Sequence, residues 1–281
     1  MCDIRLLALD LDDTLLRSDL TVSGRTKAAI RKAEEAGVKV VPASGRVPFS
    51  MEPFVRPLGL YRRSGFLIST NGALVQETLS GRTVHEARLD AKAALAAFDL
   101  VDAEDFAMQI YEGDTMYVSR HNEFTEYAKK LTGLKQVVAR DFRALLASGC
   151  RKMLIPGDPV LLAPLENILR TYLGNELTLF TSKPYYLELL PANTDKGTAL
   201  ELVAGLLGIR REEVLAVGDS PNDDAMLRWA GVGIAMCNGN ERTKALADLV
   251  SESSNDEDGV AEIIERHILA LRPMSEKKAG Q

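Results

Sequence analysis

The 281-residue sequence contains only three cysteines, three histidines and one tryptophan. Cys2, Cys150 and Cys237 are far apart and form no CxxC pair or Cys/His cluster, so neither a disulfide framework nor a zinc site is expected. Three reduced thiols in a cytosolic protein fit this pattern. The histidines lie outside every polar motif described below, which disfavours a histidine-based mechanism.

The sequence also lacks a basic arm, a membrane-length apolar run and a signal sequence. Its formal net charge is −6, so nucleic acid is not an expected partner, and an anionic substrate would have to be received by a few local cations. No apolar stretch approaches the length of a membrane span. The N-terminus leads directly into an apolar segment without a basic-then-apolar leader. These absences predict a cytoplasmic protein that binds no membrane.

Short apolar runs alternate with helical segments at both ends of the chain. Hydrophobic residues make up 46% of the sequence, enough for a sizeable core. Ser23 is a plausible N-cap, Gly37 a terminator, and Pro48 a helix start. We expect strands at 4–9, 38–41, 66–69, 214–217 and 232–234, and helices at 24–36 and from about 48, 196, 221, 241 and 259. This alternation predicts an α/β fold, a Rossmann-like doubly wound parallel sheet.

The alternation is interrupted in the middle of the chain. Two apolar-alternating segments around residues 79–82 resemble a hairpin that leaves the sheet. From about residue 90 to residue 183 the pattern changes to mixed helices and strands. We therefore predict a core formed by residues 1–81 and 184–281, and an inserted α+β cap domain at 82–183.

The first polar motif follows the first predicted strand. Asp10 and Asp12 stand at its carboxyl end, where open parallel sheets bind ligands. Two carboxylates this close repel each other unless a cation or a proton relieves them, and Mg²⁺ prefers such oxygen ligands. The alternative is an acidic turn that caps a helix.

The second and third motifs could bind an anion. Ser44, Gly45 and Arg46 follow the second strand, where a hydroxyl and backbone N–H groups can bind phosphate oxygens at a helix N-terminus. Lys196 starts a predicted helix, the unfavourable end of the helix dipole for a cation, which suggests that it serves an anion. The alternatives are that Ser44 is an N-cap and that Lys196 is an exposed lysine.

The fourth motif, residues 218–224, follows the strand at 214–217. It contains Asp219, Asn222 and Asp223, which are oxygen donors suited to a hard cation. The alternative is a loop rich in helix-capping residues. All four motifs fall where strands end or helices begin, so they predict one site.

These residues resemble the haloacid dehalogenase superfamily of phosphohydrolases, and in particular its Cof-type branch, whose cap is inserted between the second and third motifs. The likeness covers about residues 4–268. It rests on the strings DLDDTL at 10–15, SGR at 44–46, NGA at 71–73, DKG at 195–197 and GD at 218–219 with ND at 222–223. The family often has glycine where Asp13 stands, but aspartate tolerates a left-handed backbone.

The resemblance implies a role for each matching residue. Asp10 would be the nucleophile that forms an aspartyl-phosphate, and Asp12 the general acid and base. Phosphate would be held by Ser44, Gly45, Arg46 and Lys196, and other parts of the substrate by Asn71, Gly72 and Asn222. Mg²⁺ would be held by Asp10, the backbone carbonyl of Asp12, Asp219 and Asp223.

The resemblance therefore implies Mg²⁺-dependent hydrolysis of small phosphate monoesters, such as a sugar phosphate, by a monomer or weak homodimer. The alternatives are a phosphomutase that shares the aspartyl-phosphate, and a non-catalytic phospholigand-binding regulator. The cap would select the substrate. Its Arg120, Arg151 and Lys152 are conceivable contacts, although a solvated helix face is the expected place for each.

Overall fold

The computed structural model describes residues 3–60, 65–174 and 176–270, and Cys2 lies outside them. The strands are β1 (Leu6–Leu9), β2 (Lys39–Pro42), β3 (Phe66–Ser69), β4 (Leu74–Glu77), β5 (Thr83–Glu86), β6 (Gln109–Glu112), β7 (Thr115–Val118), β8 (Lys135–Val138), β9 (Met153–Pro156), β10 (Leu177–Lys183), β11 (Tyr186–Pro191), β12 (Val214–Gly218), β13 (Val232–Ala235) and β14 (Leu249–Val250). The helices are α1 (Gly24–Glu35), α2 (Pro48–Val55), α3 (Ala91–Ala103), α4 (Glu123–Thr132), α5 (Phe142–Leu146), α6 (Pro159–Leu173), α7 (Lys196–Leu207), α8 (Asp224–Trp229), α9 (Glu241–Leu246) and α10 (Gly259–Ile264).

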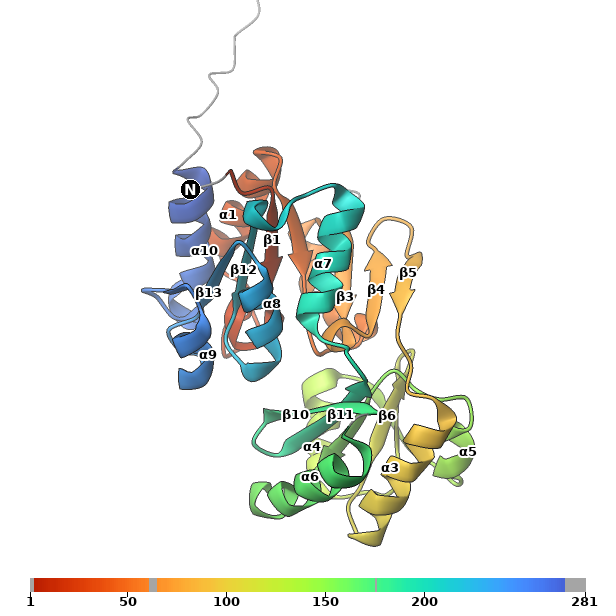
Figure 1. Cartoon of the computed structure of the whole chain (residues 1–281). Coiled ribbons are helices and arrows are strands. Elements are labelled where there is room, and N and C mark those ends of the chain that lie inside the picture. Colours follow the sequence, from red (N-terminus) through yellow and green to blue (C-terminus); the bar gives the residue numbers. More distant parts are fainter. Residues whose placement is uncertain (1–2, 61–64, 175, 271–281) are drawn as a thin grey trace, which may run out of the picture.

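A parallel sheet with the order β14-β13-β12-β1-β2 forms the centre of the core. Alternate residues of β1 face opposite sides, as the two-residue period of a strand requires. Leu7 and Leu9 pack with apolar residues of α1, α2 and α10, whereas Leu6 and Ala8 pack with those of α7 and α8. Helices therefore cover both faces (Figure 1), and the predicted doubly wound α/β sheet is confirmed.

The local signals for helix ends are confirmed in α1. The Ser23 side chain accepts a hydrogen bond from the backbone N–H of Thr26, and Gly37 after the helix has φ +90°. The predicted hairpin is also present, since β4 pairs antiparallel with both β3 and β5. A single parallel bridge between Ala43 and Ile68 joins β3 to the end of β2.

The inserted segment forms a separate mixed sheet with the order β10-β11-β9-β6-β7-β8. One face packs against α3, α5 and α6. The other carries Tyr111, Leu154 and Tyr186, which pack with apolar residues of α4. In Figure 1 this layer forms a second body beside the core, reached through the segments after β5 and before α7. The predicted inserted α+β cap is therefore present.

Strand pairing suggests slightly later boundaries for the cap than the predicted 82 and 183. β5 pairs with β4, which belongs with the core strand β3, whereas β11 pairs with β9 and β10 of the cap sheet. We propose boundaries near residues 88 and 192. No helix in the described parts of the chain has the length and hydropathy that crossing a bilayer requires.

The reactivity of Cys150 can be used to test the packing of the cap. Its side chain belongs to the apolar cluster between the cap sheet and its helices, and burial raises the pKa of the thiol to about 12. Because the thiolate is the reactive form, we expect Cys150 of the native protein to resist iodoacetamide at roughly pH 8 and to react once urea unfolds the chain. Mass spectrometry of the labelled peptides measures this, with the less buried Cys237 as the internal comparison. Rapid labelling of native Cys150 would contradict the packing.

Candidate active site

The core sheet brings the four polar motifs to one edge. Asp10 follows β1, Ser44 follows β2, Asp219 follows β12, and Lys196 begins α7. The backbone N–H of Asp10 donates to the carbonyl of Val217 (3.0 Å), which extends the parallel pairing of β1 and β12 to the carboxyl end of β1. The predicted convergence of these motifs at the carboxyl ends of the strands is therefore observed.

A tight turn after β1 sets the positions of Asp12 and Asp13. Asp13 has φ +59°, the left-handed conformation expected for an aspartate at a position where glycine is common in the family. Asp12 before it is extended, with φ −71° and ψ 130°. The Thr14 hydroxyl donates to Oδ1 of Asp219 (3.1 Å), which ties this turn to the end of β12.

Asp10, Asp219 and Asp223 form a buried cluster of carboxylates. One oxygen of each lies within 4.8 Å of the others. Burial, together with the charge of Asp223, raises the pKa of Asp10 well above its usual value and that of Asp219 to about 7. Burial is the larger cause of both shifts, and the neighbouring carboxylates add to it.

Lys196 partly compensates the negative charge of this cluster. Its Nζ lies 2.5 Å from Oδ1 of Asp10 and 2.6 Å from Oδ1 of Asp223, and its side chain is completely buried. Burial opposes the charge, but the two carboxylates outweigh it and raise the pKa of Lys196. The alternative of an exposed lysine is therefore wrong.

The carboxylate cluster fits a hard divalent cation. It offers only oxygen ligands, which Mg²⁺ prefers, and it has more negative charge than Lys196 alone balances. Both oxygens of Asp223 are already engaged, Oδ1 by Lys196 and Oδ2 by the backbone N–H groups of Asp219 and Ser220. The oxygens of Asp219 accept from the hydroxyls of Thr14 and Ser220, whereas Asp223 is held by an ammonium and by backbone N–H groups of its own loop.

Asp12 is not part of this cluster and is bound by Arg46. The guanidinium of Arg46 donates to both carboxylate oxygens, with Nε–Oδ2 2.8 Å and Nη2–Oδ1 2.7 Å. Its Nη1 donates to the carbonyl of Leu131 in α4 (3.2 Å), and its plane lies over the Phe54 ring. Arg46, predicted as a phosphate ligand, therefore binds Asp12 and the cap in this arrangement.

Ser44 and Gly45 form the turn between β2 and α2. The Ser44 side chain is buried and accepts from the backbone N–H of Arg46 (3.1 Å). The N-cap of α2 is Val47, so the alternative that Ser44 is a simple helix cap is wrong. The Gly45 carbonyl accepts from Nζ of Lys152 (2.9 Å), which connects this turn to the cap. Ser44 and Gly45 both line the cavity described below.

Asn71 and Asn222 hydrogen-bond to each other. Nδ2 of Asn222 donates to Oδ1 of Asn71 (3.0 Å), and Nδ2 of Asn71 donates to Oε2 of Glu188 in the cap (2.9 Å). Asn222 lines the cavity. Gly72 has φ +97°, and a Cβ there would come 2.2 Å from the carbonyl oxygen of Asp195. Gly72 therefore allows the turn to pack against the start of α7, which positions Lys196.

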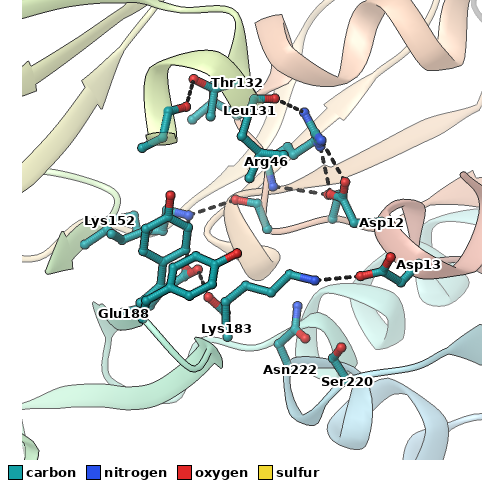
Figure 2. Close-up of a pocket in the computed structure, with 18 of the residues that line it drawn as sticks. Asp12, Asp13, Arg46, Leu131, Thr132, Lys152, Lys183, Glu188, Ser220 and Asn222 are labelled. Carbon is teal, nitrogen blue, oxygen red and sulfur yellow. Dashed lines mark hydrogen bonds and ion pairs between the residues drawn. The ribbon is translucent and has the colours of Figure 1, made fainter. Parts of the chain in front are cut away.

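The cap contributes charged groups to the site, of which the sequence indicated Lys152 but not Lys183 or Glu188. Figure 2 shows Lys183 reaching Asp13, while Lys152 and Glu188 lie together on the cap side. Lys183 Nζ is 2.6 Å from Oδ2 of Asp13, and Lys152 Nζ is 3.0 Å from Oε2 of Glu188. The Lys183–Asp13 pair joins the cap to the core, whereas Lys152 and Glu188 both belong to the cap.

The expectation that Lys152 lies on a solvated helix face is wrong. Lys152 stands directly before β9 and is buried against Glu188. Arg120 pairs with Asp102 and Asp105 and is partly exposed, and Arg151 pairs with Glu86 and Glu112. Neither arginine lines the cavity that Asp10 borders, so among the three only Lys152 faces it.

A cavity of about 280 Å³ lies between the cap and the ends of the core strands. Asp10, Asp12 and Asp219 border it from the core. On the cap side the lining residues are Gln109, Tyr111, Tyr127, Ala128, Leu131, Thr132, Lys152, Leu154, Ser182, Lys183, Tyr185, Tyr186 and Glu188. Its volume is near the low end of the range for small-molecule sites.

Known proteins resemble this chain in sequence and in fold over almost its whole length. The family described as haloacid dehalogenase-like hydrolase matches residues 7–264. Phosphatase YwpJ of Bacillus subtilis is 31% identical, over 95% of this chain and 100% of its own. The 5-amino-6-(5-phospho-D-ribitylamino)uracil phosphatase YcsE of the same organism is 31% identical, over 95% and 97%. A haloacid dehalogenase-like hydrolase from Bacteroides thetaiotaomicron has a similar structure, with a TM-score of 0.86, 32% identity and coverage of 94% and 99%.

Proposed function

Because this chain belongs to the haloacid dehalogenase superfamily and is a Cof-type phosphatase of small phosphate monoesters, we propose that Asp10 attacks the phosphorus of its substrate. The attack would form an aspartyl-phosphate and release the alcohol, and water would then hydrolyse the intermediate. The observation that carries this proposal is the position of the buried Asp10 carboxylate at the wall of the cavity, within 2.5 Å of the Lys196 ammonium.

Asp12 is the proposed general acid and base. Its carboxylate borders the cavity, close to Asp10 in the same turn, so it can face the leaving oxygen of a bound ester. It would give a proton to the departing alcohol and later take one from the attacking water. Arg46 holds both oxygens of this carboxylate, so its proposed part is to orient Asp12 as well as to meet the phosphate.

Ser44, Gly45 and Lys196 are proposed to hold the phosphoryl oxygens. Ser44 offers a hydroxyl at the cavity wall, and Lys196 offers an ammonium that already touches the nucleophile. Asn222 would contact the substrate directly, while Asn71 and Gly72 would act by keeping Asn222 and Lys196 in position. Such fixed donors stabilise the charge that develops during phosphoryl transfer.

The proposed metal is Mg²⁺, held by Asp10, Asp219 and Asp223 with the backbone carbonyl of Asp12. When bound, it would neutralise negative charge of the carboxylates and the phosphate. Without it, a phosphate dianion would enter beside a cluster whose pKa values are already raised. The cation would therefore favour the ionised, nucleophilic form of Asp10.

We expect phosphate release to depend on the divalent cation. After dialysis against a chelator, the rate of phosphate release from a panel of sugar phosphates, nucleotides and pyridoxal phosphate should fall at least about 100-fold, and Mg²⁺ should restore it. A colorimetric phosphate assay measures this. Full activity in chelator would contradict the metal proposal, and no release from any ester with Mg²⁺ would contradict the proposed function.

Two variants separate metal binding from phosphate binding. Asp219→Ala should raise the Mg²⁺ concentration needed for half-maximal activity, because it removes one of the three carboxylates of the cluster. Ser44→Ala should mainly raise KM for the ester and leave the Mg²⁺ requirement nearly unchanged. Equal shifts in the Mg²⁺ requirement for both variants would argue against this assignment.

The phosphatase relatives argue against both alternatives that the sequence left open, the phosphomutase and the non-catalytic regulator. A phosphomutase would convert a sugar phosphate into its isomer, which the same assay distinguishes from phosphate release. A cytoplasmic location and a monomer or weak homodimer remain part of the proposal.

A further inference from the structure

The cap half of the cavity is rich in tyrosine. Tyr111, Tyr127, Tyr185 and Tyr186, four of the seven tyrosines in the chain, line it and are named here the tyrosine pocket. Tyr127 and Tyr185 meet edge to face with centroids 5.5 Å apart, and Tyr185 and Tyr186 do so at 4.7 Å. Aromatic faces and edges arranged in this way favour another planar ring as their contact.

Two members of the tyrosine pocket, Tyr111 and Tyr186, lie on strands of the cap sheet, whereas Tyr127 lies on α4 and Tyr185 directly before β11. Residues two apart on a strand share a face, which places Gln109 with Tyr111 and Tyr186 with Glu188. Pairing of Gln109 and Glu188 with Leu154 brings the three strands into register on this face. Tyr111 and Tyr186 are therefore held on one face of a paired sheet together with Gln109 and Glu188.

The charges around the cavity are already balanced. Among the described residues, each arginine or lysine that lines it is paired with a carboxylate: Arg46 with Asp12, Lys183 with Asp13 and Lys152 with Glu188. A second phosphate or a carboxylate on the leaving group would find no free cation there. The cap side therefore suits a leaving group without net charge.

Among the described residues, two of the buried polar atoms without a hydrogen-bond partner belong to residues that line the cavity. They are Oε1 of Gln109 and Oη of Tyr186, and both residues line the cavity. Gln109 is completely buried, and its Nε2 donates to Oη of Tyr111 (2.6 Å), which leaves Oε1 as an open acceptor. An unsatisfied buried acceptor is costly, so a donor on the ligand would be favourable there.

From these observations we propose that the substrate is a phosphate monoester whose leaving group is an uncharged, single planar aromatic ring with an N–H or O–H donor on its edge. The ring would contact the tyrosine pocket, and its donor would meet Gln109 and Tyr186. This inference rests on the proposed phosphatase function and replaces the sugar phosphate that the family resemblance implied. The cavity of about 280 Å³ suits one ring and a phosphate.

Matched synthetic esters test the inference without a change in leaving-group chemistry. Benzyl phosphate and cyclohexylmethyl phosphate are both esters of primary alcohols, and only one carries an aromatic ring. With Mg²⁺ present, kcat/KM should be about five-fold or more higher for benzyl phosphate. 3-Aminobenzyl phosphate adds an N–H donor, and its kcat/KM should exceed that of benzyl phosphate by about ten-fold.

Variants assign each preference to its residues. Tyr127→Leu should reduce the benzyl over cyclohexylmethyl ratio toward one. Gln109→Met and Tyr186→Phe should abolish the advantage of 3-aminobenzyl phosphate while they preserve the benzyl preference. Tyr172→Leu is the matched control, since Tyr172 lies on α6 and is largely exposed, and it should change neither ratio.

The outcomes separate this inference from the proposed function. Hydrolysis of benzyl and cyclohexylmethyl phosphate with equal kcat/KM would overturn the aromatic preference and leave the phosphatase function intact. An unchanged 3-aminobenzyl advantage in both Gln109→Met and Tyr186→Phe would overturn the donor assignment. Absence of phosphate release from every ester would overturn the proposed function and this inference with it.

Discussion

Asp10→Asn should lower the rate of phosphate release by at least about 1,000-fold, because removal of a covalent nucleophile eliminates the pathway through its intermediate. Stability should be retained. Burial and the charge of Asp223 raise the pKa of Asp10, so the carboxylate is disfavoured in the folded, metal-free protein. An amide of the same shape relieves that repulsion, while Lys196 keeps its contact with Asp223. Single-turnover phosphate release and thermal unfolding in chelator measure the two effects.

Asp224→Asn is the control for this experiment. Asp224 is also buried and close in sequence to the cluster, but its Oδ1 accepts from the Thr243 hydroxyl (2.8 Å) on the side of α9. We expect nearly normal phosphate release from this variant. Near wild-type release from Asp10→Asn would exclude Asp10 as the nucleophile.

Lys196→Met should damage both stability and activity. The ammonium touches Asp10 and Asp223, and all three side chains are almost entirely buried. Removal of the cation leaves two buried carboxylates without their partner, which costs about 3 kcal/mol or more. Phosphate release should fall at least about 1,000-fold, because the phosphoryl group also loses a cation. Urea unfolding in chelator and the phosphate assay give the two numbers.

A double variant separates the two effects of Lys196. Lys196→Met with Asp223→Asn removes one of the stranded carboxylates, so it should recover much of the lost stability and none of the lost activity. The non-additivity of the two changes is the coupling energy of the buried pair. Equal stability of Lys196→Met and the wild-type protein in chelator would show that the ion pair does not support the fold.

Much of the core could be predicted because its signals are local. Strands of the parallel sheet are short apolar runs, and the polar motifs at their ends need no knowledge of distant contacts. Ser23, Gly37 and Pro48 mark helix ends through their own backbone preferences, and each lies where expected. The meeting of the motifs then follows from the rule that parallel strands carry their ligand sites at one edge.

The cap side of the site could not be predicted in the same way, because it depends on how two domains face each other. The role of Lys152 needs Glu188 and Gly45, which are distant in sequence. The sequence of β11 contains one local signal for such a contact. Glu188 interrupts the apolar run of β11, and a carboxylate in such a strand needs a buried partner. That signal indicates a polar contact but not which residue provides it.

The order of strands in the core has a consequence for biosynthesis. Leu6 in β1 pairs with Val214 in β12, so one edge of β1 stays unpaired until nearly the whole chain has left the ribosome. The cap sheet and its helices, by contrast, come from one continuous segment with its own apolar core. The cap should therefore reach its native packing first. The nascent N-terminal strands are then the part of the chain most exposed to aggregation, and a chain that ends before β12 should be insoluble.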